Sequence, residues 1–306
     1  MDSKRNVPTG ILGFPVSPFN EKDKLDEKAL YENVSFLIRH GIESIFIGCG
    51  AGEFHAISED EYETMIDVAN EATQSQVPIY TGVGGNIRTA VRQAELSEKK
   101  GVDGYLILPP YLVEGTRQGD VEYFSRIAQS TQLNAIVYQR NNVLLTKESL
   151  YQLVTIPQVV GFKDGVGNME QNIQLTQAVG DRLEWINGMP MAEVTMPAYM
   201  ALGFETFSSA ISNYIPHVSR MFYDSLLHDD KQMAADIYRD VILPINNIRK
   251  QRSGYAVALI KAGMEIVGLP VRNTVRPPLT PVEPVHYKEL EAVINVAFDK
   301  YALQTK

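Results

Sequence analysis

The side chain best suited to chemistry is Lys163, which directly follows an apolar run over residues 157–162. Burial disfavours the charged ammonium, so the pKa of such a lysine falls from its ordinary value of about 10.4. The neutral amine is a nucleophile that forms a Schiff base with a ketone or an aldehyde, and the iminium then draws electrons from a neighbouring bond. In the alternative interpretation, the ammonium extends into water or pairs with Asp164 and has no chemical role.

Two further reactive groups lie at or just after the end of the preceding apolar run, which covers residues 134–138. Tyr138 ends that run, and its phenol can pass protons while an imine forms or is released. The alternative for Tyr138 is an aromatic ring packed under a barrel rim with its hydroxyl bonded to backbone. Arg140 can bind a carboxylate through two parallel hydrogen bonds, although many arginines are simply solvated. We interpret Lys163 and Tyr138 as candidate catalytic residues and Arg140 as a candidate substrate-binding residue.

The other candidate positions also follow predicted strands and carry groups able to bind a carboxylate or a hydroxyl. They are Gly50, Ala51, Gly188, Ser208, Ser209 and Asn213. The glycine-rich loop over residues 48–52 presents backbone N–H groups that can hold a carboxylate, although a plain tight turn fits the same residues. Small polar residues after a strand also act as helix caps, so both interpretations of the serines and the asparagine stay open.

Composition limits the class of partner. The chain has 306 residues, 28 basic against 37 acidic side chains, and a net charge of −9. This balance lacks the clustered positive face that a polyanion requires, so we expect no nucleic-acid partner. A small anionic substrate needs only a few local donors and remains compatible with the charge. No apolar run approaches the roughly 18 residues that cross a bilayer, and we expect a cytoplasmic protein without membrane contact.

Metal and nucleotide motifs are missing from the sequence. The five histidines do not fall at the spacings typical of zinc ligands, and Cys49 is the single cysteine. The glycines of the loop over residues 48–52 do not match a dinucleotide fingerprint, and no G-K-[ST] follows the other glycine clusters. We therefore expect neither a metal nor an organic cofactor.

Short apolar runs alternate with amphipathic segments along most of the chain. The runs lie at residues 11–16, 44–48, 78–83, 104–108, 134–138, 159–163, 183–187 and 206–210. Because most of them lack polar alternation, we expect strands covered on both faces, which favours a parallel (β/α)8 TIM barrel over an open doubly wound sheet. Barrel enzymes hold their active sites at the carboxyl ends of such strands. We place the barrel domain at residues 1–225 and a helical C-terminal extension at residues 226–306.

Several strings of residues resemble a known family. They are GAGE at 50–53, Tyr138 at the end of its strand, and GFKD at 161–164. Together they are similar to the superfamily of dihydrodipicolinate synthase and N-acetylneuraminate lyase, which are class I aldolase-type barrels. Longer strings point to one branch, the decarboxylating dehydratases of deoxy-keto sugar acids. These are GILGFPV at 10–16, LPPYL at 108–112, FKDGVGN at 162–168, GMPMAE at 188–193, GYAV at 254–257 and IKAG at 260–263.

The resemblance implies a role for each matching residue. It makes Lys163 the Schiff-base lysine, Tyr138 the proton-handling phenol and the loop around Ala51 part of a carboxylate pocket. It also implies a hydro-lyase without a cofactor, a sugar-acid substrate and a homo-oligomer, either a dimer or a tetramer. The synthase branch carries two threonines where this chain has Gly50 and Ala51, and a second tyrosine where it has Leu112. The synthase's hydroxyl relay is therefore missing, which argues against synthase activity.

Two alternatives remain beside the dehydratase. One is a sibling lyase, aldolase or synthase that uses the same lysine on another 2-keto acid. The other is a sensor or binding protein that kept the barrel without turnover. The presence of both Lys163 and Tyr138 argues against the second alternative.

Overall fold

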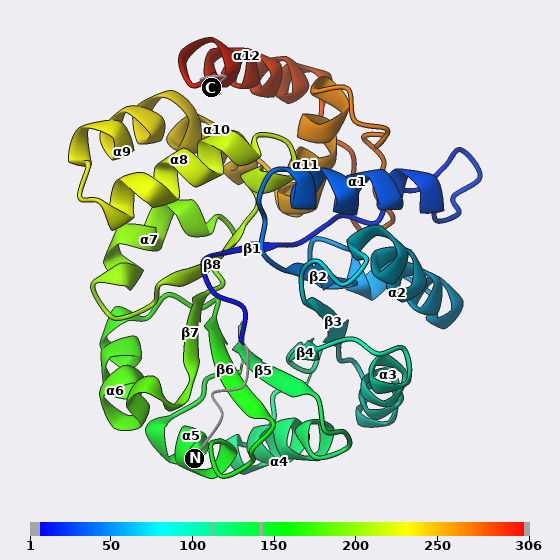
Figure 1. The fold of residues 1–306 in the computed structure, drawn as a ribbon, viewed down its shortest axis with the longest axis vertical. Helices are drawn as coiled ribbons and strands as arrows, with labels where there is room; N and C mark the ends of the chain where they lie inside the picture. The colour runs from blue at the N-terminus through cyan, green and yellow to red at the C-terminus, as the bar shows by residue number, and fades with distance from the viewer. Residues whose placement is uncertain (1–6, 112, 141–142, 303–306) are drawn as a thin grey trace. The chain divides into compact units, whose positions relative to one another are not determined.

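The computed structural model describes residues 7–111, 113–140 and 143–302 (Figure 1). Eight parallel strands form a closed barrel in the order in which they occur along the chain. The strands are β1 (Ile11–Gly13), β2 (Ile45–Ile47), β3 (Ile79–Val83), β4 (Gly104–Ile107), β5 (Asn134–Gln139), β6 (Val159–Asp164), β7 (Glu184–Asn187) and β8 (Thr206–Ser209). Nearly every strand residue is buried, as expected where both faces of a parallel sheet are covered. The predicted barrel is confirmed.

A helix follows each strand. The helices are α1 (Glu27–Arg39), α2 (Glu59–Thr73), α3 (Ile87–Lys99), α4 (Arg117–Ala128), α5 (Lys147–Leu153), α6 (Met169–Val179), α7 (Ala192–Met200) and α8 (Pro216–Leu227). At the start of α2, the Ser58 hydroxyl accepts from the Glu61 backbone N–H, and the Glu61 carboxylate accepts from the Ser58 N–H. This reciprocal capping box satisfies two backbone donors that the helix itself leaves free.

Four further α-helices continue the chain after α8. They are α9 (Lys231–Ile237), α10 (Leu243–Lys250), α11 (Tyr255–Ile266) and α12 (Pro284–Lys300). The sequence pattern predicts a helix over residues 230–252, and the chain is helical without a break from residue 231 to residue 250, with a π-helical segment, Tyr238–Ile242, between α9 and α10. Pro244 accounts for the change in hydrogen-bond pattern, because it has no N–H to donate and its ring crowds the preceding turn.

The chain divides into two compact units. The first unit comprises Met1–Leu12 and Pro78–Ser208, and the second comprises Gly13–Val77 and Ser209–Lys306. Within the second unit, α1 packs against α2 and α11 against α12. Each unit combines two separate segments of the chain, whereas the sequence predicts a single boundary between residues 225 and 226. That boundary stays a prediction.

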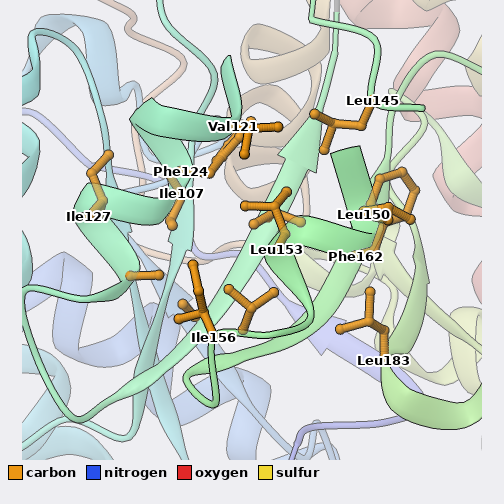
Figure 2. Packing of buried hydrophobic residues seen from close by; sticks show 14 of the residues in the cluster. Ile107, Val121, Phe124, Ile127, Leu145, Leu150, Leu153, Ile156, Phe162 and Leu183 are labelled. Atoms are coloured by element: carbon orange, nitrogen blue, oxygen red, sulfur yellow. The ribbon is translucent and has the colours of Figure 1, made fainter. Parts of the chain in front are cut away.

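The core of the first unit lies between its strands and the helices outside them. Figure 2 shows part of this core, where Phe124 of α4 and Leu153 of α5 approach Ile107 of β4 and Phe162 of β6. These side chains are fully buried. Strands β5, β6 and β7 run side by side in the same unit (Figure 1). The apolar packing behind these strands fixes the backbone that carries the candidate reactive residues.

Candidate active site

Strand alternation sends neighbouring residues at the end of β6 to opposite faces. Lys163 is paired in register with Tyr138 of β5, and Asp164 with Gln139. In-register neighbours point the same way, and the Lys163 ammonium nitrogen lies 5.0 Å from the centre of the Tyr138 ring. Only 5% of Lys163 is exposed, so its side chain does not extend into bulk water. The structure therefore brings together the two residues that the sequence suggests for catalysis.

The Tyr138 hydroxyl forms hydrogen bonds with Arg140 and with the backbone of Gly188. Arg140 donates to it from Nη1 over 2.9 Å, and the hydroxyl donates to the backbone carbonyl of Gly188 over 3.2 Å. The hydrogen bond to backbone is the contact expected for a tyrosine that only packs. The hydrogen bond from Arg140 is not expected for such a tyrosine. A guanidinium donor stabilises the phenolate that remains when a phenol gives up its proton. The arrangement is therefore suited to a phenol that donates a proton and recovers it.

Two glycines leave room for these side chains. A Cβ atom on Gly188 would lie 2.6 Å from both Cγ and Cε of Lys163, closer than real atoms approach. A Cβ atom on Gly165 would lie 2.8 Å from the Tyr138 hydroxyl. Gly188 is predicted from the sequence as a substrate-binding residue, and the structure shows that it also packs against the lysine. Gly165 is missed by that reasoning, although its place two residues after Lys163 marks a tight turn at the strand end.

The carboxylate of Asp164 lies on the other face of β6 and is fully buried. It accepts hydrogen bonds from backbone N–H groups in the turn after the strand and from side chains of β5, α6 and α7. Sequence reasoning treats Asp164 only as an ion-pair partner for Lys163. The donors are spread over about 60 residues of sequence, so no local motif reveals them.

The last predicted residue of the first unit is Ser208, at the end of β8. Its hydroxyl donates to the backbone carbonyl of Asn187 over 3.4 Å, and the residue is half-buried. A substrate contact for Ser208 stays a prediction.

Two of the remaining candidates, Ser209 and Asn213, have structural partners within the second unit. The hydroxyl of Ser209 shares a hydrogen bond of 2.8 Å with Ser219 and accepts from the backbone N–H of Ser212. Asn213 is fully buried and donates to the backbone carbonyl of Phe14 over 3.2 Å. These bonds fit the capping alternative, and substrate binding by both residues stays a prediction.

The glycine-rich loop also belongs to the second unit. Gly50 is exposed, Ala51 is half-buried, and the Gly50 carbonyl accepts from the Glu53 backbone N–H over 3.2 Å. The loop is thus a tight turn, as the structural alternative expects, and carboxylate binding there stays a prediction. Leu112, which replaces a tyrosine of the synthase branch, lies outside the described residues.

Neither a metal-ligand cluster nor a membrane-spanning helix occurs in the described residues. Nowhere in residues 7–111, 113–140 and 143–302 do three His, Cys, Asp or Glu side chains gather as metal ligands. Over the same part of the chain, no helix has both the length and the apolar character that crossing a membrane demands.

Comparison with known proteins gives a consistent result. Residues 7–297 match the model of the dihydrodipicolinate synthetase family. A Bacillus subtilis protein named probable 5-dehydro-4-deoxyglucarate dehydratase is 60% identical over 98% of both chains. A protein with the same name from Oceanobacillus iheyensis is 57% identical over 97% of both. Among solved structures, dihydrodipicolinate synthase from Oceanobacillus iheyensis superposes with a TM-score of 0.87 at 26% identity, covering 94% of this chain and 95% of that one.

Proposed function

Because the chain belongs to the dihydrodipicolinate synthetase family, we propose that it is a 5-dehydro-4-deoxyglucarate dehydratase, a hydro-lyase that also removes carbon dioxide. Relatives of that name at 57% and 60% identity over nearly the whole chain support the substrate. The structural observation that carries the chemistry is the buried amine of Lys163, 5.0 Å from the Tyr138 ring. A buried amine next to a phenol is the pair that Schiff-base catalysis needs.

The proposed reaction begins when the Lys163 amine attacks the C5 ketone of the substrate and water leaves to form an iminium. The iminium acidifies C4, a C4 proton is removed, and the resulting enamine expels the C3 hydroxyl as a second water. The C6 carboxylate then departs as carbon dioxide; the electron pair of the broken C5–C6 bond stays on C5, stabilised by the adjacent positively charged nitrogen, until C5 takes up a proton. Hydrolysis of the imine consumes one water, frees Lys163 and yields 2,5-dioxopentanoate after tautomerisation at C2. The net products are the dioxo acid, one carbon dioxide and one water.

Two residues would assist these steps. Tyr138 would donate the proton that turns the departing hydroxyl into water, and would take one back during imine hydrolysis. Arg140 would stabilise the phenolate through its Nη1 hydrogen bond and would offer its other donors to a carboxylate of the substrate. A dicarboxylate substrate suits an arginine at this position better than a neutral substrate would.

The direct test is an assay of the purified protein with 5-dehydro-4-deoxyglucarate. We expect one carbon dioxide and one 2,5-dioxopentanoate per substrate consumed, and no turnover by the Lys163→Met variant. Pyruvate release from another 2-keto acid, with no reaction of this substrate, would instead assign a sibling lyase. Binding without any product would assign a sensor. Light scattering on the same preparation tests the proposed homo-oligomer, for which we expect the mass of a dimer or a tetramer.

A further inference from the structure

The Asp164 carboxylate sits in a cage of donors within the first unit. Its Oδ1 atom accepts from the Gln139 amide over 2.8 Å and from the Val166 backbone N–H over 2.9 Å. Its Oδ2 atom accepts from the Gly167 N–H over 3.1 Å, the Asn172 amide over 2.8 Å and the Tyr199 hydroxyl over 2.5 Å. Hydrogen bonds to a charged acceptor are stronger than those to a neutral one, so this cage holds the end of β6 firmly against the segments that supply the donors.

Every one of these donors is neutral, and they come from four different segments. Gln139 belongs to β5, the two backbone N–H groups to the turn after β6, Asn172 to α6 and Tyr199 to α7. Burial and the neighbouring carboxylate raise the pKa of Tyr199, so its hydroxyl keeps its proton and remains a donor. These neutral donors satisfy the carboxylate oxygens through hydrogen bonds.

The cage connects directly to the reactive residues. Asp164 adjoins Lys163 in β6, and its carbonyl accepts from the Gly188 N–H over 2.7 Å. That bond holds the glycine against which the lysine packs. The turn that the cage orders begins with Gly165, which has no room for a Cβ beside the Tyr138 hydroxyl. A shift of this turn would therefore move the phenol as well as the amine.

We propose that Asp164 is a positioning residue, whose caged carboxylate sets the strand end of Lys163 and the turn of Gly165 so that amine and phenol reach the same substrate carbon. This inference rests on the proposed function, but the labelling of Lys163 that tests it can be measured without that reaction. The competing account is that Asp164 only stabilises the turn into α6, in which case its loss lowers stability without changing the reactivity of the lysine.

The experiment measures how fast Lys163 is labelled, using pyruvate as a simple 2-keto acid probe and borohydride to trap the imine. Peptide mass analysis identifies the labelled lysine. Asp164→Asn turns one acceptor of the cage into a donor that faces other donors, and we expect labelling to slow about 10- to 100-fold, as for a reacting group displaced by a fraction of an ångström. With the sugar-acid substrate, kcat should fall by a similar factor while KM stays within about threefold.

The matched control is Asp120→Asn, the same change at another buried aspartate of the first unit. We expect it to leave labelling and turnover within about twofold. Tyr199→Phe is the second variant, to be used should Asp164→Asn fail to fold; it removes one donor of the cage and should slow labelling about two- to tenfold.

The outcomes separate the two proposals. Labelling of folded Asp164→Asn and Tyr199→Phe at the wild-type rate would overturn the positioning role. Slow labelling of the variants, with rapid labelling of wild type and of Asp120→Asn, supports it. If wild type is labelled on Lys163 but releases no carbon dioxide from 5-dehydro-4-deoxyglucarate, the proposed function fails while the positioning role stands.

Discussion

Two buried lysines in this chain have opposite surroundings. Lys261, in α11 of the second unit, is completely buried. Its ammonium donates to the Glu53 carboxylate over 2.5 Å and to the Thr274 carbonyl over 2.7 Å, and lies 4.3 Å from the centre of the Phe19 ring. Lys163, in the first unit, is 5% exposed and has the face of Tyr138 beside it. Burial alone would nominate Lys261 as the more perturbed amine.

The carboxylates associated with the two lysines are engaged differently. Burial lowers the pKa of Lys261, but the Glu53 carboxylate opposes that shift and favours the ammonium. The second oxygen of Glu53 accepts from the Arg276 backbone N–H over 2.8 Å, so both carboxylate oxygens have a hydrogen-bond donor. In the first unit, neutral groups hold the Asp164 carboxylate on the opposite face of the strand. The comparison shows one buried lysine paired with a carboxylate, and another whose neighbour in the strand, Asp164, is hydrogen-bonded by neutral groups; the proposed nucleophile is the second.

The largest effect is expected at the phenol beside Lys163. Tyr138→Phe removes the proposed proton donor and the acceptor of the Arg140 hydrogen bond while the ring stays in place. We expect kcat to fall about 10²- to 10⁴-fold, the range for lost general acid-base catalysis. Steady-state kinetics on the sugar-acid substrate measures this, and a loss below about tenfold would reduce Tyr138 to a packing role.

A second prediction exchanges each lysine for methionine, which has a similar volume. Lys261→Met leaves the Glu53 carboxylate buried without its cation, and we expect it to lower the free energy of unfolding by about 3 to 5 kcal/mol. Lys163→Met should cost less than about 1.5 kcal/mol while abolishing turnover. Urea denaturation of both variants gives the two values.

The double variant Glu53→Gln with Lys261→Met controls this comparison. It removes both charges, so much of the lost stability should return. Equal loss of unfolding free energy in Lys261→Met and Lys163→Met would show that the ion pair with Glu53 does not distinguish the two lysines.

A third prediction concerns the space around the Lys163 side chain. In Gly188→Ala the new Cβ meets the lysine at 2.6 Å, so the amine must move. We expect kcat to fall about 10- to 100-fold, because small displacements of a reacting group are costly. Gly119→Ala, in α4, is the matched control, since its Cβ meets only the Thr116 hydroxyl oxygen at 3.4 Å. That variant should keep wild-type kinetics; a Gly188→Ala enzyme with unchanged kcat would contradict the packing argument.

The smallest effect comes from a buried base in the second unit. The ring of His217 packs against the ring of Phe298, tilted by 37° with the ring centres 5.1 Å apart, and its Nε2 finds no hydrogen-bond partner within the described residues. Burial, with a minor contribution from His40, lowers the pKa of His217 below its ordinary value of about 6.5. The unfolded chain therefore binds this proton more readily than the folded chain. Stability from His217 is present above about pH 6.5 and is lost as pH falls further.

His217→Phe keeps a ring against Phe298 and removes the titrating group. Between pH 7.5 and pH 5.5 the free energy of unfolding should fall less in this variant than in wild type, by about 1 kcal/mol or less. Urea denaturation at the two pH values measures the difference. An unchanged pH dependence would show that burial does not neutralise this base, and would weaken the same argument for Lys163.

The sequence predicts the strands well because a parallel barrel buries both faces of each strand, which leaves unbroken apolar runs. It also places Lys163 and Tyr138 together, because consecutive strands of such a barrel are neighbours and their ends meet at one rim. The Asp164 cage could not be predicted, because its donors Gln139 and Tyr199 come together only when the chain folds. The fit of Lys163 against Gly188 escapes sequence reasoning for the same reason. Pro244 was visible in the sequence, and its effect on the helix could have been anticipated.

The most direct test of the account is to add borohydride to the enzyme during turnover of 5-dehydro-4-deoxyglucarate and to locate the trapped adduct by peptide mass. We predict one adduct per chain, on Lys163, with Lys261 unmodified. An intact mass that stays unchanged, or an adduct spread over other lysines, would contradict the assignment of Lys163 as the nucleophile.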